Sequence, residues 1–243
     1  MTAAYDVIGL DYANLRRPDP RIGAMIDEAL GDAERVLNVG AGSGSYEPAG
    51  RLVTAVEPSV AMIRQRAASA APAVEAYAEA LPFEDRSFDA AMAVNTVHHW
   101  SDKARGMAEM RRVTRGRIVV LTSDPSFRDP WLLDYFPRLA TLDDAQMPSM
   151  SDYARWLGPV DVLPVPVPHD CIDGFLYSYW RRPHAYLDPA VRRAMSSFHA
   201  LGDVSAGLER LAADLDSGAW ADRYHALLDL PDRDVGYRLV VTR

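Results

Sequence analysis

The chain has 243 residues, of which 49% are hydrophobic and 25% charged, and its formal net charge is -8 at pH 7. A chain of this length can bury one sizeable core, or a core and a smaller cap. The acidic balance argues against nucleic acid as a partner, because a phosphate backbone is usually met by a basic face. A small molecule is the expected ligand.

The sequence also bears on the compartment of the protein. Its opening, MTAAYDVIGLDYANLRR, lacks the basic start and apolar stretch of a secretion signal, and no run of about 18 apolar residues predicts a membrane span. The single cysteine, Cys171, cannot form an internal disulfide or anchor a cysteine-rich metal site. We therefore expect a cytoplasmic protein with no membrane partner and no metal.

The first half of the chain alternates predicted helices and strands. A helical spacing of apolar residues follows Pro18 and Pro20 and ends at Gly31. Short apolar runs predict strands at residues 35–39, 52–56, 90–94 and 117–121. Between them, Ser59 can cap one helix and residues 102–113 fit another. This alternation predicts a parallel sheet that is covered on both faces.

After residue 121 the pattern changes. Four prolines interrupt residues 122–150, which predicts loop and short helix, with a helical patch near residues 131–140. Residues 151–158 predict another short helix. The alternating run VDVLPVPV at residues 160–167 predicts an extended element at a sheet edge, because proline is not accommodated in mid-sheet. Residues 235–242, VGYRLVVT, form the last predicted strand.

One stretch, VLNVGAGSGSYEP at residues 36–48, carries the strongest functional signal. A predicted strand runs into Gly40, Gly42 and Gly44, where the backbone can turn tightly and its N–H groups can touch a ligand without a Cβ in the way. Glu57 stands at the tip of the next predicted strand, where a carboxylate can accept two hydrogen bonds from a ribose diol. Together these features predict a nucleoside site, whereas the glycines alone would also suit a plain tight turn.

The glycine spacing bears on which nucleoside binds. A dinucleotide site favours G-x-G-x-x-G and a full helix facing a pyrophosphate, but this chain has G-x-G-x-G, and Pro48 and Gly50 leave room for about one helical turn. A P-loop is excluded because no G-K-[ST] follows the glycines. S-adenosylmethionine has no phosphate and joins an adenosine to a zwitterionic amino acid, which suits the arrangement.

Three segments in order, VLNVGAGSGSYEP, VTAVEPSVAMI and AEALPFEDRSFDAAMAVNTVHHW, resemble the successive motifs of class I S-adenosylmethionine-dependent methyltransferases, especially the branch that acts on small molecules. The resemblance covers residues 35–121, and YDVIGLDYANLR near the start is similar to the opening of that branch. It implies an α/β, doubly wound, Rossmann-like fold with a mostly parallel seven-stranded sheet. S-adenosyl-L-methionine would lie across the carboxyl ends of the first strands, with S-adenosyl-L-homocysteine as the product.

The resemblance also implies roles for individual residues. Glu57 would hold the ribose, while Tyr12 would close over the cofactor or, alternatively, fasten the first helix to the sheet. Asn38 and Tyr77 stand where the family commonly has acidic residues, so that Glu79 or backbone groups must meet the adenine amine. The other contacts that it implies are the turn at Gly40, Ala41, Gly42 and Gly44, the adenine flank at Pro58, Ser59 and Met62, the adenine edge at Ala78 and Glu79, and the methionine portion at Asn95.

Methyl transfer from a sulfonium is an in-line displacement that asks the protein to align the reactants and exclude water. A hydroxyl or amine acceptor also gains from a general base. His98 and His99 directly follow a predicted strand, at the end where ligands collect in such sheets, and are the main candidates. A packing role for this pair is the alternative.

A second cluster, PHDCIDGFLYSYWRRPHAYLD at residues 168–188, holds a third candidate, His169, among charged and aromatic residues. Its ligand spacing does not suit a metal. Half of the 22 aromatic residues fall between Phe127 and Tyr186, which favours a lid wall over an apolar or aromatic acceptor, although core packing would also use them. The basic run from Arg111 to Arg117 is interpreted as a solvated helix end.

The sequence therefore predicts a single methyltransferase domain over residues 1–243. Its predicted parts are an N-terminal lid helix at 1–30, a cofactor-binding core at 35–121, an aromatic-rich cap with further core elements at 122–234 and the last strand at 235–242. The predicted reaction is O-, N- or C-methylation of a small, apolar or aromatic acceptor, as in specialised metabolism. The alternatives are a nicotinamide-dependent oxidoreductase, a nucleic-acid or protein methyltransferase, and a protein that binds the cofactor without methylating.

Overall fold

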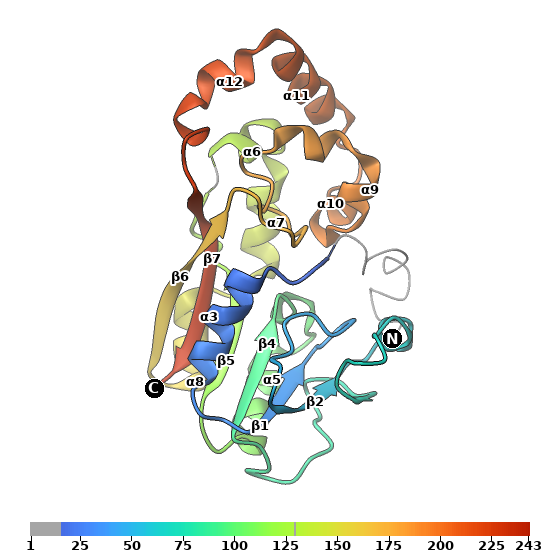
Figure 1. The fold of residues 1–243 in the computed structure, drawn as a ribbon, viewed down its shortest axis with the longest axis vertical. Coiled ribbons are helices and arrows are strands. Elements are labelled where there is room, and N and C mark those ends of the chain that lie inside the picture. Colours follow the sequence, from blue (N-terminus) through green and yellow to red (C-terminus); the bar gives the residue numbers. More distant parts are fainter. Residues whose placement is uncertain (1–15, 129) are drawn as a thin grey trace.

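A computed structural model describes residues 16–128 and 130–243 of the chain. Its centre is a seven-stranded sheet in the lower half of Figure 1, and a group of helices stands above it. The strand order is β3-β2-β1-β4-β5-β7-β6, in which β1 to β5 pair in parallel and β7 pairs antiparallel with both neighbours. The strands are β1 (Arg35–Val39), β2 (Leu52–Val56), β3 (Ala73–Val74), β4 (Ala90–Val94), β5 (Ile118–Ser123), β6 (Val160–Pro168) and β7 (Asp232–Thr242).

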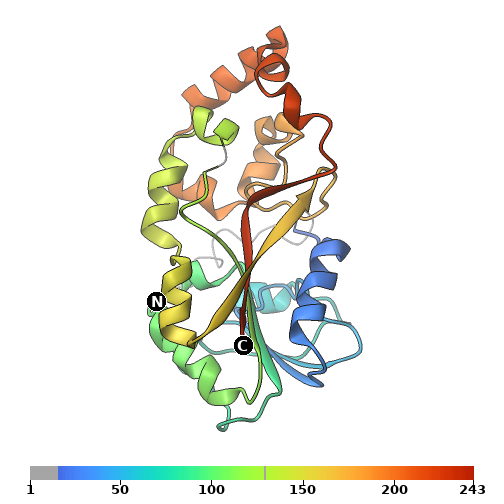
Figure 2. The ribbon, with the colours of Figure 1, turned by 90° about the vertical axis from the view of Figure 1, so that its left-hand side faces the viewer.

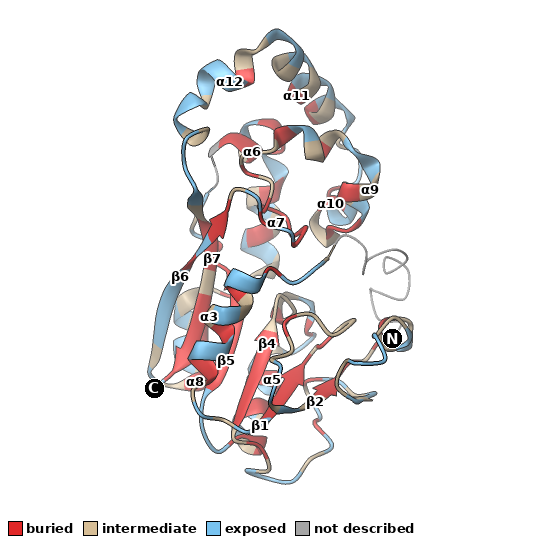
Figure 3. Cartoon of the chain, viewed as in Figure 1, coloured by how far each residue is buried: buried red, intermediate tan, exposed pale blue. Residues whose placement is uncertain are grey.

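The central strands read as continuous apolar runs because helices cover both faces of the sheet. Along β4, Ala90 and Met92 join one core cluster while Ala91 and Ala93 join the other. Helix α3 (Pro20–Leu30) covers the first face, and α5 (Lys103–Val113) and α8 (Met150–Leu157) cover the second. Figure 2 shows the sheet edge-on between these helices, and Figure 3 shows its central strands buried and the edge strand β6 largely exposed.

Side-chain caps fix where the core helices begin. Asp19 caps α3, Asp102 caps α5, and Ser59 caps the short helix α4 (Val60–Arg64), each accepting a hydrogen bond from a backbone N–H of the first turn. Helix α8 begins with a capping box in which Ser149 and Asp152 exchange hydrogen bonds. The sequence therefore determines these boundaries locally.

Two insertions between the last strands build the cap. The first lies between β5 and β6 and contains α6 and α7, and the second lies between β6 and β7. The long strands β6 and β7 connect the sheet to this helical group (Figure 1). The cap helices are α6 (Pro130–Tyr135), α7 (Arg138–Gln146), α9 (Pro189–Arg193), α10 (Ser196–Leu201), α11 (Ser205–Ser217) and α12 (Ala219–Arg223). The cap also contains the 3-10 turns η2 (Pro183–Leu187) and η3 (His225–Leu227), whereas the 3-10 turn η1 (Val97–His99) follows β4 in the core.

The cap has an aromatic core centred on Trp131. Its ring lies edge-on to those of Tyr186 and Trp220, each 5.4 Å away, and its indole N–H donates to the carbonyl oxygen of Trp180 at 2.9 Å. Trp131, Trp180 and Tyr186 are fully buried. The aromatic richness of residues 127–186 therefore serves mainly to pack the cap, and only a minority of these rings face a cavity.

The predicted fold class is confirmed: the sheet is seven-stranded, mostly parallel and doubly wound, and helices cap it. The expectation of about one helical turn after the glycines is wrong. Residues 40–51, all of which the structure describes, form turns and no helix. In the part of the chain that the structure describes, no helix is both long and apolar enough to cross a membrane.

Candidate functional site

A tight turn follows β1 and closes one side of a large cavity. The N–H groups of Gly40 and Ala41 both donate to the carbonyl oxygen of Val56, at 2.8 and 2.9 Å. Gly40 has a φ of +70°, and a Cβ on it would lie 2.1 Å from Oγ1 of Thr96. Only glycine lets the turn approach the segment after β4 so closely.

Glu57 directly follows β2 and faces this turn. Its Oε2 accepts a hydrogen bond from the Gly42 N–H at 2.8 Å, and its Oε1 accepts one from the Ser59 N–H at 2.9 Å. The residue is 6% exposed. Two backbone donors thus fix a carboxylate at the carboxyl edge of the sheet, where doubly wound folds bind their ligands.

The turn and Glu57 line a cavity of about 540 Å³. This volume lies within the usual range of small-molecule sites, about 300 to 1,000 Å³. The predicted cofactor residues that line it are Gly40, Ala41, Gly42, Glu57, Pro58, Met62, Ala78, Glu79 and Asn95. Gly44 and Ser59 are not among the described lining residues, and Ser59 instead accepts the Met62 N–H to cap α4. Tyr12, like Tyr5, lies outside the described residues.

Several other residues of the large cavity were not predicted as cofactor contacts, although Asn38 and Tyr77 had been singled out as departures from the family pattern. Most of them flank the predicted motifs by a few positions, and that proximity is the signal that could have found them. Arg16 is separate, because it is the last residue of YDVIGLDYANLR, the segment that resembles the opening of the family branch, and no role had been predicted for it. The flanking residues are Asn38, Ser43, Ser45, Tyr46, Tyr77, Val94, Thr96, Trp100 and Ser101.

Two amides of this cavity have a buried polar atom without a partner. Asn38 donates from Nδ2 to Oε1 of Glu47 at 3.2 Å, but its Oδ1 has no hydrogen-bond partner among the described residues. The same holds for Nδ2 of Asn95, which follows β4 with a φ of +51°. Because unpaired buried polar atoms are costly, this acceptor and this donor indicate a ligand with complementary groups.

Glu47 holds the turns of residues 40–51 in place where a helix is expected. Its carboxylate accepts hydrogen bonds from Asn38, from Nη2 of Arg66 at 2.5 Å and from the Ala71 N–H at 2.9 Å. Arg66 also donates to the carbonyl oxygen of Gly42 at 3.1 Å. The network explains why position 38 carries an amide, because a second carboxylate beside Glu47 would repel it.

Glu79 lines the large cavity, but its carboxylate is engaged with the start of α5. It accepts hydrogen bonds from the Ser101 hydroxyl at 2.8 Å and the Asp102 N–H at 3.1 Å. Burial acts to raise the pKa of Glu79, but the hydrogen bonds from Asp102 and Ser101 lower it below its usual value. Glu79 is therefore held as an anion at the cavity wall.

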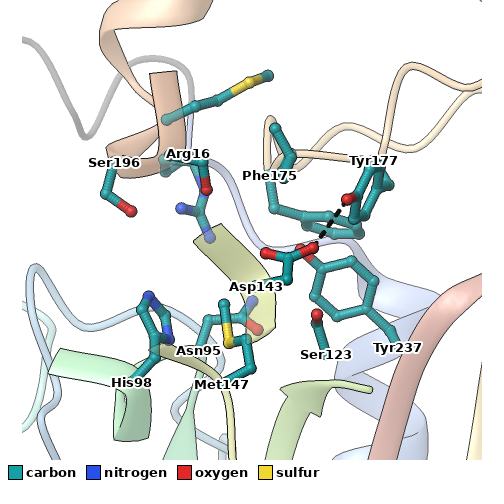
Figure 4. A pocket seen from close by; sticks show the side chains of 13 residues that line it. Arg16, Asn95, His98, Ser123, Asp143, Met147, Phe175, Tyr177, Ser196 and Tyr237 are labelled. Carbon is teal, nitrogen blue, oxygen red and sulfur yellow. Dashed lines mark hydrogen bonds between the residues drawn. The ribbon is translucent and has the colours of Figure 1, made fainter. Parts of the chain in front are cut away.

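A second, smaller cavity lies beside the first (Figure 4). Arg16 and Asn95 line both cavities, so that they mark the boundary between them. The polar residues that line the smaller cavity are Arg16, Asn95, His98, Ser123, Asp143, Tyr177, Ser196, Ser197 and Tyr237, and the apolar ones are Met147, Phe175, Leu176 and Met195.

The two adjacent histidines face different cavities. His98 lines the small cavity, whereas His99 lines the large one. Burial lowers the pKa of His98 well below its usual value, and the positive charges of His99, Lys103 and Arg16 lower it further. His98 is therefore a neutral imidazole at physiological pH, and such a group can accept a proton.

Asp143 brings a buried carboxylate from α7 into the small cavity. It is 3% exposed, and its Oδ2 accepts a hydrogen bond from the Tyr177 hydroxyl at 3.0 Å, as Figure 4 shows. Burial raises the pKa of Asp143 to about 6, although the Tyr177 hydrogen bond and the charge of Arg128 oppose the shift. No sequence motif contains Asp143, since its partner lies 34 positions away.

A buried ion pair joins the glycine turn to the wall of the small cavity. Arg16 donates from Nε to Oδ1 of Asp173 at 2.6 Å, and Asp173 accepts from the Tyr46 hydroxyl through Oδ2 at 2.9 Å. Tyr46 is buried and has a φ of +62°. Asp173 thus fixes both the cation at the boundary and the end of the turn.

His169, the third candidate base, is not among the described residues that line either cavity. It follows β6 and is half-buried, and its backbone N–H donates to the carbonyl oxygen of Pro231 at 2.9 Å.

The single cysteine, Cys171, is a buried structural residue. Arg182 donates to the carbonyl oxygens of Cys171 and Ser178. Burial raises the pKa of the Cys171 thiol to about 12, so that it stays protonated. Among the described residues, no group of three or more His, Cys, Asp or Glu side chains could hold a metal ion.

The arginines of the basic run from Arg111 to Arg117 form ion pairs and hydrogen bonds with other residues of the same chain. Arg112 pairs with Glu109 and Asp85, and Arg115 pairs with Asp89. Arg111 and Arg117 donate to the carbonyl oxygens of Leu157 and Ala29. The run therefore fastens the ends of secondary-structure elements.

Comparisons with known proteins agree with this geometry. A family model described as a methyltransferase domain matches residues 37–120. The chain is 34% identical over 114 residues to a demethylmenaquinone methyltransferase from Renibacterium salmoninarum, which is 42% of this chain and 48% of that protein. The aligned parts cover between 30 and 58% of the curated relatives' own lengths.

Solved structures extend the likeness to the whole chain. The [4+2]-cyclase SpnF, at 16% identity and a TM-score of 0.57, covers 98% of this chain and 91% of its own, and it shares the fold alone. A candidate methyltransferase from an antibiotic biosynthesis pathway of Anabaena variabilis is 35% identical, with a TM-score of 0.88 over 95% of this chain and all of its own. The chain therefore belongs to the class I S-adenosylmethionine-dependent methyltransferases.

Proposed function

We propose that this protein transfers a methyl group from S-adenosylmethionine to a small molecule. The observation that carries the proposal is the fixed carboxylate of Glu57, which faces the glycine turn inside a cavity of about 540 Å³. A carboxylate at this place suits a ribose diol, and exposed turn backbone suits an amino-acid tail.

The partnerless atoms of the large cavity fit this cofactor. Oδ1 of Asn38 can accept a hydrogen bond from an ammonium group, and Nδ2 of Asn95 can donate one to a carboxylate. Under this proposal Pro58 and Met62 flank the adenine. Ala78 meets the adenine edge, because the carboxylate of Glu79 is engaged with Ser101 and Asp102.

The remaining predicted contacts act through the backbone. Gly44 shapes the turn, and Ser59 orients Glu57 by donating its N–H to Oε1. Closure of Tyr12 over the cofactor stays a prediction.

When bound, S-adenosylmethionine supplies an electrophilic methyl group on a sulfonium. The acceptor's lone pair forms the bond to the methyl carbon while the carbon–sulfur bond breaks and its electron pair goes to sulfur. The proton left on a hydroxyl or amine acceptor passes to a ring nitrogen of His98, which lines the small cavity as a neutral base. We assign no proton transfer to His99 or His169, because His99 lines the cofactor cavity and His169 lies apart from both linings.

Two alternatives make different predictions. A nicotinamide-dependent oxidoreductase would bind NADH, which the turns of residues 40–51 disfavour because they present no helix N-terminus to a pyrophosphate. A non-methylating protein of the same fold would bind the cofactor but leave its methyl group in place.

Calorimetric titration of the protein with S-adenosylhomocysteine and, separately, NADH tests the cofactor. We expect binding of the first and none of the second, and the reverse result would refute the proposal. Incubation with methyl-labelled S-adenosylmethionine and a panel of phenols, alcohols, amines and activated carbon acids then tests the transfer. Label in an organic product is expected, and binding without label in any product would favour the non-methylating alternative.

A further inference from the structure

The small cavity contains a carboxylate that the fold does not neutralise. Asp143 is 3% exposed, and its carboxylate has no ion-pair partner among the described residues. Arg128, whose charge acts on Asp143, pairs instead with the exposed neighbour Asp144 at 2.6 Å. The Arg16 guanidinium, which lines the same cavity, is paired with Asp173.

A buried carboxylate of this kind is costly to the folded protein. Removal of a charge from water is compensated only when hydrogen bonds or an opposite charge replace the water. Asp143 has one such hydrogen bond, from Tyr177 to Oδ2. Its other oxygen, Oδ1, is turned toward the cavity in Figure 4 and is available to a ligand that donates a hydrogen bond.

The surroundings limit what this ligand can be. The free volume of the small cavity is about 40 Å³, and since one water needs about 10 to 15 Å³ on this measure, there is room for a few atoms only. The rings of Phe175 and Tyr237, 4.4 Å apart, form one wall. The cavity therefore takes the polar group of a small or planar acceptor, whose other atoms would extend past Arg16 and Asn95 into the adjoining large cavity.

We infer that Asp143, held by Tyr177, is the acceptor-binding residue, and that the acceptor is a small molecule whose hydroxyl or amino group donates a hydrogen bond to Oδ1. This inference rests on the proposed function, because the small cavity borders the cofactor cavity at Arg16 and Asn95. It narrows the sequence-based expectation of an apolar or aromatic acceptor to one that carries a hydrogen-bond donor, since the cap's aromatic residues mostly pack its core.

Phenol, aniline and toluene provide matched probes, because they share one shape and only the first two can donate a hydrogen bond. Their dissociation constants are measured by NMR titration against the protein saturated with S-adenosylhomocysteine. We expect phenol or aniline to bind at least about tenfold more tightly than toluene, the scale of one hydrogen bond to a charged group. Comparison of phenol with aniline separates a hydroxyl acceptor from an amine acceptor.

Asp143→Asn tests the residue with little change in shape. Its amide oxygen would keep the Tyr177 hydrogen bond, which turns the amide NH₂ toward the cavity, where it cannot accept from the probe. The preference over toluene should therefore fall well below tenfold in this variant, because a hydrogen bond that the neutral amide donates to the probe is weaker than one that a charged carboxylate accepts. Asp144→Asn is the matched control on the same helix, and it should keep the preference, because Asp144 is exposed and is not among the described lining residues.

Two results would overturn the inference. In one, phenol and aniline bind no better than toluene, including the case in which none of the three binds. In the other, Asp143→Asn keeps the preference. Either result leaves the proposed function standing as long as S-adenosylhomocysteine binds, whereas a failure of S-adenosylhomocysteine to bind defeats the proposed function first.

Discussion

The rings of His98 and His99 lie 3.8 Å apart, centroid to centroid, yet they face different cavities. The 3-10 turn η1 (Val97–His99) places them at the carboxyl end of β4 and directs one ring to each side of the boundary. Under the proposed function these adjacent residues would have separate tasks, acceptor chemistry at His98 and cofactor contact at His99.

This division predicts different kinetic effects. His98→Ala should lower kcat by about 10²- to 10⁴-fold, the usual contribution of a general base, and leave the affinity for S-adenosylhomocysteine nearly unchanged. His99→Ala should instead weaken that affinity and change kcat less. Steady-state kinetics with the acceptor found in the panel, together with calorimetry, measure both. Equal effects of the two variants on kcat would contradict the division.

The lowered pKa of His98 also predicts a pH dependence. Because burial disfavours the imidazolium, the folded protein keeps His98 neutral until the pH falls well below the usual histidine pKa. We expect kcat to stay level between about pH 6.5 and pH 8, with any loss on the acid side. A kcat that halves near pH 7 would show that His98 is not the base.

Glu57→Ala should weaken the binding of S-adenosylhomocysteine. The loss of hydrogen bonds to a charged group is worth about 1.5 to 3 kcal/mol, which is about a 10- to 150-fold rise in Kd. Glu84→Ala removes an exposed carboxylate and is the control. Calorimetry measures both, and an unchanged Kd in Glu57→Ala would mean that the ribose lies elsewhere.

Two glycines offer a matched pair of substitutions. Both have a positive φ, but a Cβ on Gly50 would meet nothing within 4 Å, whereas one on Gly40 would overlap Thr96. Gly50→Ala should therefore cost only about 1 to 2 kcal/mol of stability, through backbone strain. Gly40→Ala should cost more and abolish cofactor binding. Urea unfolding and calorimetry give both quantities, and normal cofactor affinity in Gly40→Ala would show that the turn does not approach the ligand as described.

Asn38 and Glu47 should be energetically coupled. Asn38→Asp places a second carboxylate beside that of Glu47, and we expect it to destabilise the fold by about 1 to 3 kcal/mol. In a Glu47→Gln background the same substitution should cost at least about 1 kcal/mol less, because the repulsion is gone. Urea unfolding of the wild type, the two single variants and the double variant gives the four free energies of unfolding that this double-mutant cycle compares. Equal costs in both backgrounds would show that Glu47 does not explain the amide at position 38.

Asp143 should reduce stability at neutral pH. Because its pKa is raised from 3.8 to about 6 on folding, the folded protein binds a proton through this window while the unfolded chain loses it. Stability therefore falls as the pH rises from about 4 to about 6, by about 2 to 3 kcal/mol in total, and the cost is absent at lower pH. Asp143→Asn should be more stable than the wild type at pH 8 but not at about pH 4. An equal gain in the free energy of unfolding at both pH values would show that the cost does not come from ionisation of Asp143.

The sequence predicted the sheet well for a physical reason. Strands buried on both faces need uninterrupted apolar runs, so β1, β2 and β4 have the predicted bounds, and Pro164 and Pro166 correctly placed β6 at the edge. The two-residue strand β3 is too short to leave such a signal. Helices α9 to α12 were also missed. Helices α9, α10 and α12 are five or six residues long, and α11, with 13 residues, buries few of its own side chains.

Of the two cavities of the candidate site, the large one could be predicted from the sequence and the small one could not. Residues of the large cavity follow three adjacent parallel strands, so their place could be predicted from where each strand ends, as for Gly40, Glu57 and Asn95. The small cavity could not, because Asp143 and Tyr177 come from the two insertions and Arg16 from the segment before α3, and they meet only through tertiary packing. Sequence position likewise could not reveal that hydrogen bonds from Arg66 and Ala71 to Glu47 hold the turns of residues 40–51 in place.

A crystal structure of the protein with S-adenosylhomocysteine tests the central claim most directly. We expect the ribose hydroxyls to lie within hydrogen-bond distance of the Glu57 carboxylate and the amino-acid tail to lie against the turn of Gly40 to Gly42, with Asn38 and Asn95 paired. A ligand bound elsewhere, with this cavity empty, would contradict the account.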